Sequence, residues 1–226
     1  MIACRSLALG MCVLLGACVQ LPVTRQDTTL TQRESLWQER QATLAGYLKW
    51  DLAGRLAVRA GDQAASVTII WRRRDRSSRI DLIGAFGGGR VTITEESHGA
   101  SLQKSSDRPV TGPTAEAVLY QALGWQMPFT ELGYWLRGLP GPQTVEASEL
   151  DDSGRLLKLV QSGWEVNYLD YRRYDSVELP RKIYARALSE ALPTDIRTSA
   201  GLAPQFTVKI VINRWQKDST SEDESA

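Results

Sequence analysis

The sequence DLAGRLAVRA, residues 51–60, alternates apolar and polar side chains with a period of two. Leu52, Leu56 and Val58 fall on one face of an extended chain. Arg55 and Arg59 fall on the opposite face. A strand of this kind buries one face and leaves the other in water, which is typical of antiparallel sheets. The stretch therefore predicts a strand of an antiparallel sheet with one solvated face.

The same period of two returns in many segments downstream, and glycine or polar turns separate them. Before the middle of the chain, the pattern runs through Trp71, Leu82, Val91 and Ile93. Short turns between alternating segments indicate successive antiparallel hairpins. The strands predicted after the first are 66–72, 79–83, 90–96, 143–150, 155–161, 164–171, 181–188 and 205–215.

A helix is predicted before the first strand, in the segment TQRESLWQERQATLAGYLKW. Thr31 and Glu34 have the spacing of a capping box, in which each side chain bonds the backbone N–H of the other. Trp37, Leu44 and Leu48 share one face of a helix with 3.6 residues per turn. The segment is therefore expected to pack as an amphipathic helix.

Two more helices are predicted in the middle of the chain, at 113–125 and 130–138, with threonine near each start and glycine at each end. One helix, a set of strands, two helices and further strands together predict an α+β fold. One large antiparallel sheet would carry helices on one side, and a sheet of this size is expected to curl. The seven tryptophans fit either a filled aromatic core or the wall of an apolar cavity, and the sequence leaves both open.

The N-terminus, MIACRSLALGMCVLLGAC, has one positive charge followed by a short apolar run. This is the pattern of a secretory signal, and the small residues before Cys18 resemble a bacterial lipobox. We expect a signal peptide at 1–17, lipidation of Cys18 and a tether at 18–30. The alternative is an ordinary signal with a chance cysteine. A folded domain is expected at 31–215, followed by a disordered acidic tail at 216–226.

Charge and motifs argue against several classes of function. Removing residues 1–17 takes away Arg5 and no acid, so 27 basic and 26 acidic residues become 26 of each. A nearly neutral chain is not steered as a whole to nucleic acid. The loop GAFGGG, 84–89, leads into a predicted strand, whereas phosphate-binding glycine loops lead into a helix. The single histidine, His98, lies in a predicted turn without evident partners. We therefore expect no enzyme, no metal site and no cofactor.

The segment RRRDRSSR, 72–79, places five arginines within eight residues. It is either a solvated hairpin tip or a surface that attracts phosphate headgroups or an acidic partner. If residues 79–83 form a strand, these arginines and Phe86 lie at opposite ends of it. They are therefore not expected to form one site.

Several longer stretches resemble one known family. They are WDLAGRLAV, LGWQMPFTELGYWLRGLP, GRLLKLVQSGWEVNYLDY followed by LPRKIYA, and the terminal VKIVINRW. In order and spacing they resemble the LolB family of outer-membrane lipoprotein receptors, across nearly all of residues 30–215. The resemblance implies an incomplete, unclosed β-barrel that is covered by about three helices and holds an apolar cavity. Trp71, Leu82, Val91 and Ile93, which alternate onto one face, are the candidates for its wall.

The resemblance also implies a function without catalysis. Members of this family accept lipoproteins from a soluble periplasmic carrier, LolA, and place them in the inner leaflet of the outer membrane. The implied partners are therefore a LolA-like carrier, lipoprotein acyl chains and outer-membrane lipid, and the chain is expected to act as a monomer that faces the periplasm. The family has an apolar residue on a protruding loop, a place that Phe86 fills here. The alternatives are a LolA-type carrier, or an envelope lipoprotein that binds another apolar ligand or has a structural role.

Replacing Cys18 with alanine should block lipidation and leave an unprocessed precursor, because the acylated atom is the cysteine sulfur. Metabolic labelling with palmitate measures this, with the unchanged chain as the positive control. Continued incorporation of label into the Cys18→Ala protein would show that residues 1–18 are not a lipoprotein signal.

Overall fold

The computed structural model describes residues 28–60, 63–85, 89–105, 107–125, 127–188 and 206–217. Cys18 and Phe86 lie outside the described residues, as do residues 218–226. The elements are α1 (Thr28–Ala45), β1 (Lys49–Ala60), β2 (Gln63–Arg74), β3 (Ser77–Ala85), β4 (Gly89–Glu96), β5 (Gly99–Lys104), β6 (Val110–Gly112), α2 (Ala115–Leu123), α3 (Phe129–Trp135), β7 (Val145–Leu150), β8 (Leu156–Gln161), β9 (Trp164–Tyr174), β10 (Val177–Ala187) and β11 (Phe206–Lys217).

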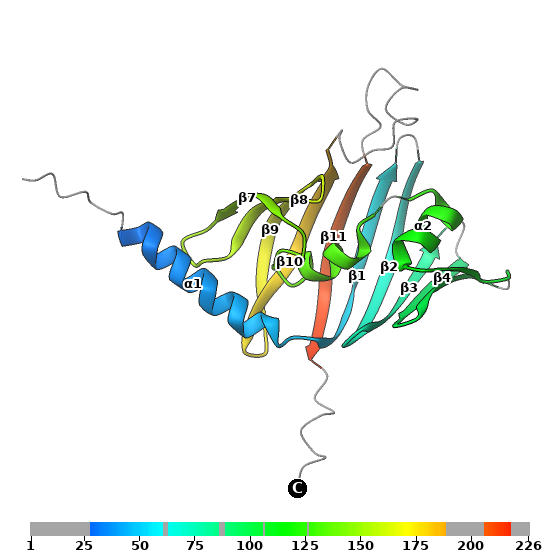
Figure 1. Ribbon diagram of the computed structural model, residues 1–226, viewed down its shortest axis with the longest axis horizontal. Helices are drawn as coiled ribbons and strands as arrows, with labels where there is room; N and C mark the ends of the chain where they lie inside the picture. Colours follow the sequence, from blue (N-terminus) through cyan, green and yellow to red (C-terminus); the bar gives the residue numbers. More distant parts are fainter. Residues whose placement is uncertain are drawn as a thin grey trace, which may run out of the picture.

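The strands form one antiparallel sheet of 11 strands in the order β6-β5-β4-β3-β2-β1-β11-β10-β9-β8-β7. Each strand before β6 and each after β7 pairs with its neighbour along the chain, while β1 and β11 join the two series. In the described residues, β6 and β7 are the two edges of the sheet, so it does not close (Figure 1). The predicted α+β fold with an unclosed antiparallel sheet is confirmed.

The alternation in β1 is confirmed by burial. Leu52, Leu56 and Val58 are buried, whereas Arg55 and Arg59 are exposed. The central strands repeat this pattern, so the sheet has one apolar face and one polar face. Burying a large apolar side chain contributes about 1.5–3 kcal/mol, which makes the apolar face the main source of stability.

Gly54 allows β1 and β11 to approach each other at an irregular point of their ladder. The register shifts there, from Ala53 opposite Arg214 to Gly54 opposite Ile212. A Cβ atom at position 54 would overlap the carbonyl oxygen of Val211 and lie 3.0 Å from Cα of Ile212. Because both contacts are to backbone, a side-chain rotation cannot relieve them. Position 54 therefore requires glycine.

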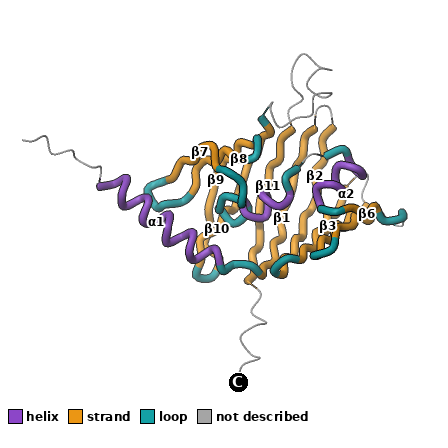
Figure 2. Tube along the Cα trace, in the orientation of Figure 1, coloured by secondary structure: helices purple, strands orange, loops and turns teal. Residues whose placement is uncertain are grey.

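The helices lie over one face of the sheet (Figures 1 and 2). Helix α3 contacts strands that are far apart in the sheet order. The ring of Phe129 stacks on Trp71 of β2 at 4.7 Å between centroids. Trp135 lies 6.3 Å from Trp164 of β9. One short helix reaches both strands because the sheet curls around it, and the predicted curl is thereby observed.

Helix α1 is fastened to the β8–β10 side of the sheet through polar contacts. Arg40 donates to the carbonyl oxygen of Glu178 at 2.6 Å and lies over the ring of Tyr171. Arg155 lies over the same ring, and the Tyr171 hydroxyl donates to the carbonyl oxygen of Leu156. Burial raises the pKa of Tyr171, which keeps this hydroxyl protonated as a donor.

The capping prediction for α1 is wrong. The helix begins at Thr28, so Thr31 is already inside it and the last three residues of the predicted tether, 28–30, are helical. It ends at Ala45, which places Leu48 beyond the helix with half of its side chain exposed. Trp37 and Leu44 do face the sheet side. The N-terminal half of α1 is polar and has no strong apolar pattern, so the sequence did not indicate where the helix begins.

Both middle helices lie where they were predicted, but only the second has the predicted threonine cap. Thr114 caps α2 by accepting from the N–H of Ala117, and Gly124 ends it with a φ of 68°. By contrast, α3 starts at Phe129 after Pro128. The hydroxyl and N–H of Thr130 instead donate to Glu116 of α2. The short strands β5 and β6 were not predicted, and β11 continues two residues past 215, the predicted end of the domain.

None of the helices in the described part of the chain combines the length and the apolar composition needed to span a bilayer.

Replacing Gly54 with alanine should lower the free energy of unfolding by about 1–3 kcal/mol, the range for overpacked sites, because the new Cβ meets rigid backbone. The matched control is Gly46→Ala. Nothing lies within 4 Å of a Cβ built at position 46, so this change should be neutral or stabilise by about 0.4–1 kcal/mol. Urea unfolding followed by tryptophan fluorescence measures both. Equal stability of the two variants would contradict the assignment of Gly54.

Candidate functional site

The concave face of the sheet carries a connected array of aromatic rings. Trp50 of β1 lies 5.0 Å from Trp215 of β11 and 5.4 Å from Trp71 of β2, measured between ring centroids. Phe129 extends this array onto α3. Tilted and edge-on packing of this kind is favourable for aromatic pairs. These side chains are almost fully buried, so the array forms the centre of the interior.

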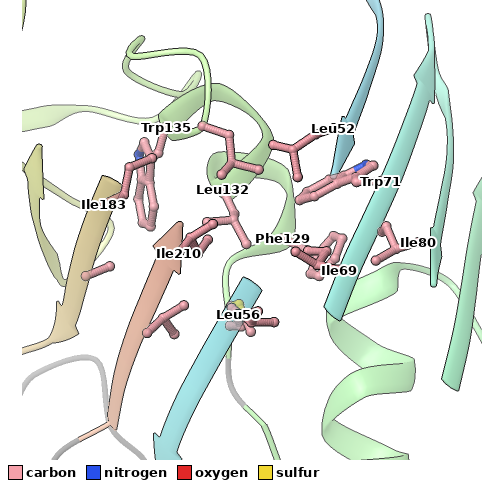
Figure 3. Close-up of a cluster of buried hydrophobic side chains, with 14 of the residues drawn as sticks. Leu52, Leu56, Ile69, Trp71, Ile80, Phe129, Leu132, Trp135, Ile183 and Ile210 are labelled. Atoms are coloured by element: carbon pink, nitrogen blue, oxygen red, sulfur yellow. The ribbon is translucent and has the colours of Figure 1, made fainter. Parts of the chain in front are cut away.

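A second aromatic group lies across the interior from the first. Trp164 of β9 contacts Trp135 of α3 and, at 5.5 Å, Phe206 of β11. Figure 3 shows Phe129, Leu132 and Trp135 pointing from α3 into the space between Trp71 and Ile183. In this structure, the side chains of α3 therefore occupy the middle of the apolar interior.

The four residues predicted to line the cavity share one face of neighbouring strands. Trp71, Leu82, Val91 and Ile93 are each at most 3% exposed. Leu82 of β3 is opposite Val91 of β4, and Ile93 lies two residues further along β4. Trp71 lies on β2, on the other side of β3. The structure thus brings them together on the inner face. Their role as the wall of a ligand cavity stays a prediction.

Two buried polar side chains hold α3 in place, and sequence analysis did not identify either of them. Gln161 of β8 is fully buried. Its side-chain oxygen accepts from Nε1 of Trp135 at 3.0 Å and from the N–H of Gly141 at 2.8 Å. Its amide nitrogen donates to the carbonyl oxygens of Gly141 and Gln143. This one side chain ties α3 and the segment that follows it to the sheet.

Arg137 is the second anchor, just beyond the end of α3. Its guanidinium donates to the carbonyl oxygens of Gly133, Leu44 and Tyr47. It also lies 4.8 Å from the ring centroid of Tyr134. No carboxylate forms an ion pair with it in the described part of the chain, and burial lowers its pKa. A buried guanidinium held by carbonyl oxygens and an aromatic ring thus ties α3 to the junction of α1 and β1.

A small cavity lies beside this anchor. It measures about 30 Å³ and is lined by Trp50, Thr130, Gly133 and Arg137 among others. This is room for ordered water, which needs about 10–15 Å³, and is far too small for an acyl chain. Access of a larger apolar ligand to the interior at this point therefore requires movement of α3.

The strands β3 and β4 on either side of Phe86 pair up to their ends. Ala85 pairs with Gly89 across the β3–β4 hairpin, and Gly84 has a φ of 85° beside a register shift. The glycine segment is thus a hairpin connection, as predicted, and it does not lead into a helix. The β2–β3 turn with its arginines lies at the other end of β3. The two features are therefore separate.

The arginine-rich turn is largely neutralised by local acids. Arg72 and Arg79 both pair with Asp81, while Arg74 pairs with Asp51 at 2.7 Å. These contacts fit a solvated hairpin tip better than an open anion site.

The predicted turn position of His98 is confirmed. Its side chain is 81% exposed and lies 3.4 Å from the carboxylate of Glu96. The described residues contain no cluster of three or more metal-ligating side chains.

Comparison with known proteins places this interior in a family. The family model "Outer membrane lipoprotein LolB" matches residues 48–215. The chain is 34% identical over 215 residues to an outer-membrane lipoprotein LolB of Nitrosococcus oceani, covering 94% of this chain and 98% of that one. It is 35% identical over 182 residues to one of Alkalilimnicola ehrlichii, covering 79% of this chain and 88% of that one.

Two solved structures align with most of this chain. A LolA superfamily protein from Nitrosomonas europaea aligns with a TM-score of 0.49 at 10% identity, covering 81% of this chain and 92% of that one. A putative outer membrane lipoprotein-sorting protein domain from Vibrio parahaemolyticus gives 0.47 at 9% identity, covering 86% and 95%. The match of the family model over more than half of the chain, together with these sequence relatives, shows that the chain belongs to the LolB family.

Proposed function

We propose that this protein is an outer-membrane receptor that accepts lipoproteins from a LolA-like periplasmic carrier and releases them into the inner leaflet of the outer membrane. The observation that carries the proposal is the apolar concave face of an unclosed sheet, covered by helices held through a few polar anchors. Such a face binds acyl chains without catalysis. The assignment rests on membership of the LolB family, and it requires no bond to be made or broken.

The physical reason for such a receptor is the cost of exposing lipid to water. Each methylene group removed from water contributes about 0.8 kcal/mol, so exposing the acyl chains of one lipoprotein costs tens of kcal/mol. Cargo therefore passes between apolar surfaces and does not diffuse free. The receptor needs a surface that is apolar enough to bind the acyl chains. Its affinity for them must also be low enough for their release into the membrane.

In this structure, α3 occupies the space that acyl chains would take. Phe129 and Leu132 fill the interior between Trp71 and the opposite strands. We infer that cargo displaces α3 from the sheet and replaces these contacts with its own. The wall then includes Trp71, Leu82, Val91 and Ile93. Because one apolar contact replaces another, the exchange changes the free energy of the apolar contacts little. Its free-energy cost is then determined by the hydrogen bonds of Arg137 and Gln161 that must break.

The lipid anchor and the β3–β4 connection fit the delivery step. Lipidation at Cys18 would hold the receptor at the outer membrane, where Phe86 would enter the leaflet while cargo leaves the interior. A soluble carrier of the LolA type has no use for such an anchor, so that alternative is not favoured. An envelope lipoprotein with another apolar ligand would not need to take cargo from a carrier. Purified receptor that strips lipoprotein from its carrier is the result that supports the proposal, and failure to do so would refute it.

Replacing Arg137 with methionine should lower the free energy of unfolding by about 1–3 kcal/mol, because it leaves buried carbonyl groups without donors. The same change should increase the affinity for a fluorescent fatty acid, because displacing α3 becomes easier. The control is Arg172→Met, which removes an exposed arginine from β9 and should change neither quantity. A loss of fatty-acid affinity at 10 °C, where the variant is still folded by circular dichroism, would contradict the displacement of α3.

Replacing Phe86 with glutamate should leave cargo acceptance intact and stop delivery, because a carboxylate resists insertion into the acyl region. Phe86→Leu is the matched control and should deliver cargo like the unchanged protein. Cross-linking of cargo to the receptor measures acceptance, and transfer of labelled cargo into liposomes measures release. Delivery by Phe86→Glu at the unchanged rate would show that the connection does not act on lipid. Unfolding of this variant would show instead that Phe86 belongs to the core.

A further inference from the structure

The outer face of the sheet carries an unbalanced group of positive charges. Arg55 and Arg59 project from β1, Lys209 and Arg214 from β11, and Lys182 from β10. Each of them is adjacent along its strand to at least one buried residue, such as Leu56, Val58 or Ile210, so these side chains point away from the interior. We call these five residues the basic face. No helix covers this side of the sheet in the described residues, since the helices lie over the concave side (Figures 1 and 2).

The strand register brings these charges together. Arg55 and Lys182 both lie opposite Val211 of β11, one on each side of it. Lys209 lies opposite Ala57, two residues from each arginine of β1. Strands are about 4.8 Å apart, so charges on β1 and β10 stand about 10 Å from each other across β11. At this distance like charges repel measurably at ordinary salt concentrations.

Acidic residues do not offset the basic face. The only acids in β1, β2, β10 and β11 are Asp51 and Glu178, near the end that carries the arginine turn. Asp51 pairs with Arg74, and Glu178 pairs with Arg155. In the described part of the chain, none of the five cations of the basic face takes part in an ion pair.

The neighbouring Arg186 has a partner of its own. It and Lys158 both bind Glu165, and the hydrogen bonds from these two cations lower the pKa of Glu165 to about 2. The contrast shows that this sheet can pair its cations where an acid is supplied. At the basic face, Lys182 lies opposite Asp170 of β9, but that carboxylate pairs with Arg181 at 3.2 Å. The described residues of β1 and β11 supply no acid that pairs with Arg55, Arg59, Lys209 or Arg214, although the chain as a whole is nearly neutral.

A hollow in the outer surface gives access to these cations. It has a volume of about 430 Å³ and is lined by Ala57, Arg59, Ser66, Tyr184 and Lys209 among others. The small side chains of β1 and β2 form its floor, so the two cations stand at its sides. A phosphodiester group that enters this hollow meets the positive charges of Arg59 and Lys209.

The Arg59 end of the basic face and the proposed lipid-contacting connection between β3 and β4 lie at the same end of the sheet. Arg59 lies next to the end of β1 that pairs with the start of β2, and β3 returns toward that same end before it reaches Ala85. The connection between β3 and β4 thus leaves the sheet at the end where Arg59 lies.

We propose that the basic face binds the anionic phospholipid headgroups of the leaflet in which the receptor is anchored, and so turns the connection that carries Phe86 toward the lipid. This rests on the proposed function for the anchor and for the delivery step. Each basic residue near an anionic surface contributes on the order of fivefold in affinity. The anchor keeps the body close to the leaflet, so even a modest attraction sets its orientation.

The test uses the lipidated full-length protein in vesicles of phosphatidylethanolamine, alone or mixed with phosphatidylglycerol. Once Cys18 is acylated and residues 1–17 are removed, the chain has no free thiol. Ser66→Cys therefore places one fluorescent label in the hollow, and Ser153→Cys places one in the exposed β7–β8 turn. A quencher attached to lipid headgroups reports which label lies at the surface.

The label at position 66 should be quenched more strongly when phosphatidylglycerol is present, and the label at position 153 should not. About 1 M salt shortens the screening length to about 3 Å and should abolish the difference. The triple variant Arg55→Gln, Arg59→Gln and Lys209→Gln should lower the docked population about a hundredfold. The matched control, Arg76→Gln with Arg172→Gln and Arg173→Gln, removes three charges at the other end of the sheet and should keep the quenching.

Several results would overturn the proposal. One is equal quenching of the two labels. Another is quenching at position 66 that does not change with phosphatidylglycerol or with salt. The third is a triple variant that is quenched as strongly as the unchanged protein. Protection of the label at position 66 by the carrier but not by vesicles would assign the surface to a protein. Cargo acceptance is assayed separately in detergent solution. If the unchanged protein does not accept cargo, the proposed function is refuted. If the label at position 66 of the same protein is still quenched in the presence of phosphatidylglycerol, the role of the basic face is supported independently.

Discussion

The pairing of β1 with β11 is the constraint on which the rest of the structure depends. It joins residues about 150 positions apart and converts two hairpin series into one sheet. Closing so long a loop is unfavourable in entropy, and the ladder must compensate with many registered pairs and a buried inner face. The approach of the two backbones at Gly54 is therefore more than a local detail, because any side chain there would separate the two halves.

The curl that this pairing produces determines what the interior can do. A flat sheet would leave α3 in contact with a few neighbouring strands, but here α3 touches β2 on one side and β9 on the other. Its contacts with the sheet are apolar along the helix, and its polar contacts are at Thr130, at Trp135 and around Arg137. Apolar contacts are not directional and can be exchanged for contacts with another apolar surface. The polar contacts are directional and fix the position of α3 against the sheet.

Local patterns in the sequence predicted the elements that are decided locally. The period of two in β1 and the threonine and glycine around α2 are examples, because a strand's faces and a helix's caps depend on adjacent residues. The strands β5 and β6 are short and polar and owe their place to pairing with β4. Arg137 bonds carbonyl groups about 90 residues away. No local pattern contains such a contact, and the anchors of the candidate site were therefore missed.

Register also explains how a nearly neutral chain acquires a polarised surface. Alternation along one strand decides only which face of the sheet a charge occupies. The pairing of β1, β11 and β10 then decides which charges become neighbours, and it gathers five cations while the acids of β7 lie at a free edge. Composition gives only the sum of charges, whereas an approaching membrane responds to their arrangement within about 10 Å. The same pairing that closes the apolar interior thus also forms the charged outer face.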